Sequence, residues 1–172
     1  ICYLISKNGI MIKKKLGLID CIVPVDTISV LEDIKPYAKM SIPKIPADIF
    51  AQITAFFRAI YDEYRAESMA LMFLNPKTNE YYIHIPYQKV STGGIEYHRG
   101  FVLENYVMVC SIHSHANFGA FHSGTDHDDE KNFDGLHITI GKLGNEFVEI
   151  ASSIMANGTR FKVDPLDYIE GI

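Results

Sequence analysis

The chain has 172 residues, of which 48% are hydrophobic and 22% charged, which is typical of a soluble globular domain rather than a disordered or membrane-spanning chain. Its formal net charge of −5 and pI near 5.8 exclude a mainly electrostatic nucleic-acid binder, which needs a basic surface to neutralise phosphates. Three widely spaced cysteines predict neither a disulfide framework nor a zinc knuckle, so we expect a reducing, cytoplasmic location without membrane association.

Residues 1–45 are predicted to form an N-terminal extension built on a β-hairpin. Two strand-like runs flank Asn8-Gly9, a strong hairpin signal because both residues tolerate positive φ. A third strand is expected at residues 18–23. From Pro24 to Pro46 the pattern breaks up, which predicts a connector that either wraps the core or links to it.

A helix is predicted to begin at Pro46, since proline suits a first turn and Asp48 complements the helix dipole there. Its apolar residues recur at three- and four-residue steps and define one face to be buried: Phe50, Ile53, Phe57, Ile60 and Tyr64. After Glu67, the apolar run "SMALMFLN" predicts a buried central strand that pairs with "YYIHIP" in a hairpin.

The rest of the chain is predicted to be a loop followed by strands. Residues 88–105 are polar and contain "TGG", so part of this segment is expected to be a mobile loop beside the next strand. That strand covers residues 106–112. Consecutive antiparallel strands are then expected in "LHITIG", "EFVEIASSIM" and "TRFKV", which makes the predicted fold class α+β.

The segment from Ser111 to Glu130 holds four histidines and four acidic residues. His113 and His115 are two apart, so on a strand their imidazoles point to the same face and can approach one ion. Asp126 is a candidate third ligand, from a short loop or helix start that folds back over the strand end. Two histidines, one carboxylate and a water form the open tetrahedral arrangement of a catalytic zinc.

These residues also have ordinary structural explanations when taken singly. A strand-end histidine is usually solvated, Asp126 could be a capping carboxylate, and Ser123 before Gly124 could be a turn or N-cap serine. A further ligand such as His122 or Asp129 would instead close the site and make the zinc structural.

The combined spacing is more informative than any single residue. His113, His115, Ser123 and Asp126 follow the pattern H-S-H-x7-S-x2-D without a gap. This pattern resembles the JAMM motif of the MPN domain family, in its metal-binding class. The motif also expects a glutamate between the first core helix and the first core strand, where Glu67 stands.

The resemblance covers roughly Pro46 to Val163. The opening "YLISKNG", together with the motif segment and "LHITIGKLG", is similar to the prokaryotic JAB branch and its PRTRC system protein A group. The resemblance implies the MPN fold, which is JAB/cytidine-deaminase-like, with a curved mixed β-sheet flanked by helices. Residues 46–172 would be the catalytic core, and residues 1–45 would be a family-specific hairpin extension rather than a separate domain.

The resemblance further implies a zinc metallopeptidase or isopeptidase. One zinc per chain would be held by His113, His115 and Asp126, and its water would hydrolyse an amide or isopeptide bond. Glu67 would move the water's proton to the leaving amine, and Ser123 would donate a hydrogen bond to the oxyanion. The expected substrate is a peptide or protein, such as a ubiquitin-like or carrier protein. The resemblance leaves the oligomeric state open between a monomer and a homodimer, although MPN domains often pair.

Two departures from the family pattern are small residues. Ala116 replaces a proline that many relatives have after the second histidine, and Ala70 replaces a glycine common in the glutamate strand. Only nine residues separate Asp126 from Leu136, where ubiquitin-recognising relatives carry a sizeable insertion. The alternative function is a non-catalytic MPN-type scaffold, although such members have generally lost motif residues that this chain retains.

Overall fold

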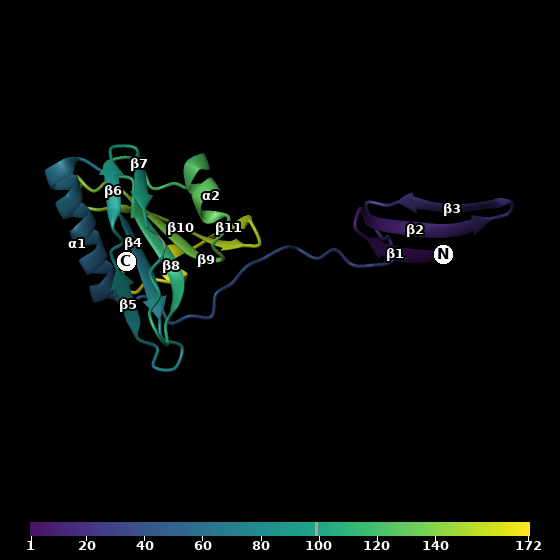
Figure 1. Cartoon of the computed structure of the whole chain (residues 1–172), viewed down its shortest axis with the longest axis horizontal. Helices are drawn as coiled ribbons and strands as arrows, with labels where there is room; N and C mark the ends of the chain where they lie inside the picture. Colours follow the sequence, from purple (N-terminus) through teal and green to yellow (C-terminus); the bar gives the residue numbers. More distant parts are fainter. Residues whose placement is uncertain (99) are drawn as a thin grey trace. The chain divides into compact units, whose positions relative to one another are not determined.

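The computed structural model describes residues 1–98 and 100–172, with Leu16 described by its backbone alone. They divide into two compact units, Ile1–Pro36 and Tyr37–Ile172 (Figure 1). The boundary between the units falls after Pro36, nine residues before the boundary predicted at residue 45. Residues 37–45 pack with the second unit, where Ile45 is fully buried. None of the helices formed by the described residues combines the length and the apolarity that crossing a bilayer requires.

The first unit is a three-stranded antiparallel sheet of β1 (Cys2–Ser6), β2 (Gly9–Leu16) and β3 (Ile19–Pro24). The predicted hairpin and third strand are therefore confirmed. The hairpin pairs Ser6 with Gly9, and Gly9 has a φ of 109°, a conformation open to a residue without a Cβ atom.

The second unit is built on a six-stranded sheet in the order β11-β10-β9-β8-β4-β5. The strands are β4 (Met69–Leu74), β5 (Tyr81–His84), β8 (Val107–Ser114), β9 (Gly135–Gly141), β10 (Glu149–Ala156) and β11 (Thr159–Val163). β8 and β9 are parallel and the other neighbours are antiparallel, so the sheet is mixed. The short helix α2 (Gly124–Glu130) lies in the connection between β8 and β9. The α+β class is confirmed.

Helix α1 (Ala47–Tyr64) packs on the sheet through Phe50, Ile53 and Phe57, as its apolar spacing predicts. It appears in Figure 1 as the long helix beside β4 and β5. Tyr64 was wrongly predicted to be buried and is 57% exposed, since the helix ends there and Arg65 follows in a left-handed conformation with a φ of 53°.

The two faces of the sheet differ in chemistry because alternate residues of each strand point to opposite sides. Beneath α1 the face is apolar, and its buried residues include Met72, Ile112 and Ile138. The other face carries His113, next to Met69 of β4 on one side and Thr139 of β9 on the other. β4 is buried on both faces, which explains its uninterrupted apolar sequence.

Residues 88–105 contain more regular structure than a loop. Gln88–Ser91 and Gly94–Tyr97 form the strands β6 and β7 of a separate two-stranded hairpin. The Gln88 side chain joins this hairpin to β4, accepting a hydrogen bond from Met69 N at 2.8 Å and donating one to Met69 O at 3.0 Å. Residues 98 and 100–105 form no helix or strand, so the predicted loop covers only this latter part of the segment. In residues 88–97, side-chain bonds to neighbouring elements support the short strands.

Candidate metal centre

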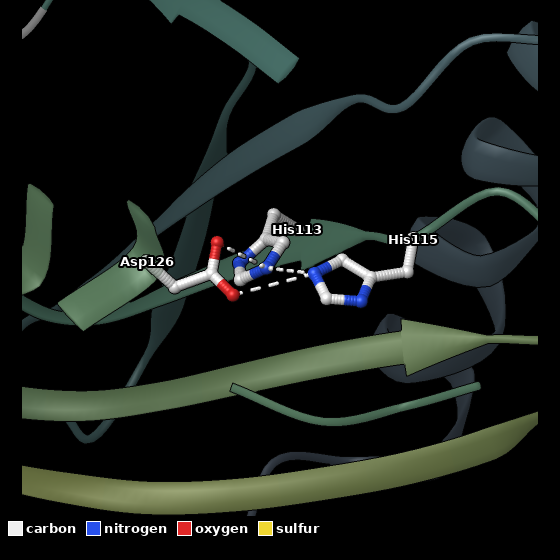
Figure 2. Close-up of side chains that lie close together, drawn as sticks. All are labelled: His113, His115 and Asp126. Carbon is white, nitrogen blue, oxygen red and sulfur yellow. Dashed lines mark hydrogen bonds and ion pairs between the residues drawn. The ribbon is translucent and has the colours of Figure 1, made fainter. Parts of the chain in front are cut away.

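β8 positions the two histidines of the motif. His113 is the penultimate residue of the strand, and His115 continues its path, with its N–H donating to Ile140 O at 2.8 Å. The alternation of a strand therefore extends to His115, and both imidazoles point to the same side of the sheet (Figure 2). Both histidines are almost fully buried.

Asp126 reaches the histidines from α2, as the sequence predicts. Figure 2 shows the three side chains converging. His113 Nε2 lies 3.2 Å from His115 Nε2 and 3.4 Å from Asp126 Oδ1, while His115 Nε2 lies 3.3 Å from Asp126 Oδ2. The two distances to Asp126 end on different carboxylate oxygens. With one ligand atom from each residue, the three atoms lie within 4.8 Å of one another, close enough to approach one ion.

Ser123 is the N-cap of α2. Its Oγ accepts a hydrogen bond from Asp126 N at 3.1 Å, and Asp126 Oδ2 accepts one from Ser123 N at 2.6 Å, which completes a capping box. The N-cap explanation of Ser123 is thus correct. It leaves the donor capacity of the hydroxyl available, because the cap uses Oγ as an acceptor.

The loop after β8 supplies an acceptor for the second histidine. His115 Nδ1 lies 3.3 Å from Gly119 O, an acceptor for an N–H at Nδ1. A neutral ring that donates there has its lone pair on Nε2, the nitrogen of the candidate ligand set. This loop crosses directly over Gly141 at the end of β9. A Cβ atom added to Gly141 would lie 2.5 Å from Phe118 O and 2.5 Å from Ala120 N, so only glycine fits beneath the loop.

Glu67 lies between α1 and β4, in the segment that precedes the strand. Its N–H donates to Ser91 O at 2.9 Å, so the β6–β7 hairpin helps to hold this segment in place. The side chain is half-buried and faces a cleft of about 320 Å³. The five predicted site residues all line this cleft: Glu67, His113, His115, Ser123 and Asp126.

The cleft walls combine acidic and apolar groups. Asp129 and Glu130 add further carboxylates from α2. The apolar and glycine lining comes from β4, the β6–β7 hairpin and the loop after β8, and consists of Met69, Gly93, Gly94, Ile95, Tyr97, Phe118 and Phe121. The cleft therefore places apolar surface beside carboxylates that attract cations.

The titration of these groups reflects burial and mutual attraction. Burial opposes the ionisation of Asp126, but hydrogen bonds with His113 and His115 outweigh it and hold its pKa well below the usual range. Burial likewise acts to lower the pKa of His115, yet the hydrogen bond and charge of Asp126 and the charge of Glu67 give a net rise. Burial raises the pKa of Glu67, against the opposing influence of the two histidines.

A buried polar cluster behind the histidines was missed from the sequence. Glu130 is 4% exposed, and its carboxylate accepts a hydrogen bond from Arg160 Nη2 of β11 at 2.6 Å. The spacing of four residues from Asp126 places Glu130 on the same side of α2 and could have drawn attention to it. The partners Arg160 and His137 could not have been found that way, because the pairing of distant strands brings them there.

The remaining charged residues of the segment have separate environments. Burial lowers the pKa of His122 to about 4, and its Nδ1 lies 3.3 Å from Thr139 Oγ1. Asp128 is exposed and pairs with Lys131 at 2.9 Å. Asp129 accepts a hydrogen bond from Tyr97 Oη at 2.8 Å, which ties α2 to the β6–β7 hairpin. Among the described residues, the set that could hold a metal ion consists of His113, His115 and Asp126.

Comparisons with known proteins add no relative: no family model matches the chain, and no curated protein matches its sequence significantly.

Proposed function

We propose that the chain is a zinc-dependent hydrolase with the MPN fold and a JAMM site, cleaving an amide or isopeptide bond in a peptide or protein. The observation that carries this proposal is one cleft lined by all five motif residues, in which one ligand atom each of His113, His115 and Asp126 lie within 4.8 Å of one another. The spacing of the motif is a second support, because it is a property of the amino-acid sequence, whereas the cleft is a property of the folded chain.

The residues would divide the chemistry between them. His113, His115 and Asp126 would hold the ion, and a bound zinc supplies a water that loses its proton near pH 7 together with positive charge for the substrate carbonyl. Glu67 would accept and return a proton, a role that suits a half-buried carboxylate whose pKa is raised by burial. The Ser123 hydroxyl would donate a hydrogen bond to the oxyanion.

The decisive experiment separates metal binding from turnover. Asp126→Ala is expected to lose zinc, because it removes the carboxylate of the donor set. Glu67→Gln is expected to keep one zinc per chain and to lose about 100-fold to 10,000-fold in kcat, since the amide cannot accept the proton. Metal content would be measured by elemental analysis, and turnover against linear and isopeptide-linked carrier-protein fusions.

Matched controls exist on the same elements. Asp128→Ala removes an exposed carboxylate from α2, and Glu63→Gln changes an exposed glutamate near the end of α1; both variants should bind zinc and turn over substrate like the parent. A folded parent protein without affinity for zinc would overturn the proposal and favour the scaffold function. Undiminished turnover by Glu67→Gln would remove Glu67 from the proposed base role.

A further inference from the structure

Glu130 is a buried carboxylate held from one side by a guanidinium. Its Oε2 accepts from Arg160 Nη2 at 2.6 Å, and Arg160 Nη1 donates to Ser153 Oγ at 2.6 Å. A guanidinium can only donate hydrogen bonds, so the group facing Arg160 must be an acceptor. Oε2 is thereby committed to Arg160, and Oε1 is directed to the opposite side.

Oε1 faces two imidazoles. It lies 3.4 Å from His137 Nδ1 and 3.8 Å from His113 Nδ1. His137 already has partners for both nitrogens: Nε2 donates to Phe133 O at 3.0 Å, and Nδ1 lies 2.7 Å from Ser111 Oγ. His137 Nδ1 is the nearer of the two nitrogens, but a neutral His137 that donates from Nε2 has no proton at Nδ1. The N–H left for Oε1 is therefore that of His113 Nδ1.

A metal ligand places a specific demand on His113. Its Nε2 faces His115 and Asp126, so that nitrogen must carry a lone pair and Nδ1 must carry the proton. A histidine ligand usually donates this second N–H to a carbonyl or a carboxylate. His115 has the Gly119 carbonyl for this purpose, and the carboxylate positioned to do the same for His113 is Glu130.

We propose that Glu130 is a positioning residue of the metal centre: clamped by Arg160, it accepts the Nδ1–H of His113 and keeps the Nε2 lone pair directed toward the ion. A shift of about 1 Å brings the 3.8 Å separation to hydrogen-bond length. The inference rests on the proposed function, because it requires His113 to be a zinc ligand. Helix α2 would then supply both a ligand, Asp126, and, one turn later, the residue that positions a ligand, Glu130.

Glu130→Gln tests the proposal because it changes one group and reverses the hydrogen bond. Arg160 must still face an acceptor, so the amide oxygen of the glutamine turns to Arg160 and its NH₂ turns to His113 Nδ1. An NH₂ donor selects the tautomer with the proton on Nε2, which cannot bind metal. We expect zinc affinity, measured by competition with a chelator, to fall by about 10-fold to 100-fold.

Asp128→Asn is the matched control. It removes the same unit of charge from the same helix by the same chemical change, but Asp128 is exposed and pairs with Lys131. Its zinc affinity should stay within about twofold of the parent, because only a screened surface charge is lost. An equal fall in both variants would overturn the proposal in favour of a general charge effect.

A spectroscopic measurement distinguishes positioning from a purely structural role. In the zinc-loaded parent with ¹⁵N-labelled histidine, the Nδ1–H proton of His113 should resonate far downfield, as expected for a donor to a carboxylate, and should exchange slowly with water. Rapid exchange or the shift of a water-bonded imidazole would overturn the proposal, even if Glu130→Gln fails to fold. A parent without zinc affinity would overturn both proposals, whereas parental zinc affinity in Glu130→Gln would overturn the role of Glu130 alone.

Discussion

At the scale of single residues, Ala116 determines how the chain leaves the second predicted ligand. Ala116 is almost fully buried, has a φ of 47°, and accepts a hydrogen bond from Leu143 N at 3.0 Å. Proline is locked near −65° and cannot adopt this conformation. The absence of proline here, where many members of the family that the sequence resembles have one, therefore agrees with the path of the loop over Gly141.

Ala116→Pro is expected to lower the free energy of unfolding by about 3 kcal/mol and to weaken zinc binding, because the loop that carries Gly119 would have to change course. Ala116→Gly is the control and should stay within about 1 kcal/mol of the parent, since glycine adopts positive φ without strain but loses more entropy on folding. Urea unfolding of the metal-free proteins measures the stability of both variants, and competition with a chelator measures their zinc affinity. Parental stability in Ala116→Pro would mean that the loop follows another path.

At the scale of elements, α2 depends on its attachments. It spans seven residues, well below the length at which an isolated helix is stable in water. The capping box of Ser123 and Asp126 stabilises its first turn from within. The bond from Tyr97 to Asp129 and the ion pair of Glu130 with Arg160 attach the helix to other elements. Geometry at Asp126 is thus maintained by contacts with the rest of the fold.

Ser123→Ala is expected to lower the free energy of unfolding by about 1 kcal/mol, because the N–H of Asp126 loses its cap. The same change removes the proposed oxyanion donor, so kcat should also fall on the order of 100-fold. Ser123→Thr retains both functions of the hydroxyl and should recover most of the stability and turnover. Turnover that survives in Ser123→Ala despite the loss of stability would limit Ser123 to its capping role.

The elements differ in how well the sequence predicts them. β4 and α1 have strong patterns, because full burial produces a continuous apolar run and one-sided burial produces a helical repeat. The β6–β7 hairpin has four-residue strands of mixed polarity, and its support comes from Met69 of β4 and Asp129 of α2. Tertiary hydrogen bonds of this kind leave no local pattern, which is why the sequence predicts no strands in this segment.

At the scale of the whole molecule, the apolar core belongs to the second unit. The main cluster of buried residues runs from Ile45 to Ile169. Among the described side chains of the first unit, the only buried hydrophobic one is Ile12. Chains below about 40 residues usually need disulfides or metals to fold, and the three cysteines are all free. The stability of the second unit should therefore not depend on the first.

A protein of residues 37–172 is expected to unfold cooperatively, with a free energy of unfolding within about 1 kcal/mol of the full chain, and to bind the same amount of zinc, since all five site residues lie within it. An isolated peptide of residues 1–36 is expected to be unfolded by circular dichroism. If residues 37–172 are unfolded in the absence of residues 1–36, the two units are not independent in stability.

The candidate site was predictable only in part. The spacing of His113, His115, Ser123 and Asp126 lies within one segment, and the structure brings these residues to one cleft together with Glu67. Glu67 was predicted by family resemblance and not by local chemistry. Arg160 was not predicted, because its partner Glu130 is thirty residues away in the sequence and strand pairing brings them together.

The close contact at Gly141 also bears on how distant relatives could be recognised. Backbone atoms of the overlying loop exclude every side chain there, so the identity of this position is dictated by space rather than by chemistry. Fourteen residues separate Asp126 from Gly141. A search pattern that adds a glycine at this spacing to the ligand motif therefore contains a criterion that does not depend on the ligands. A chain that meets the ligand spacing but has a larger residue at this point would have to route its loop differently, so the extended pattern separates a shared architecture from a shared set of ligands.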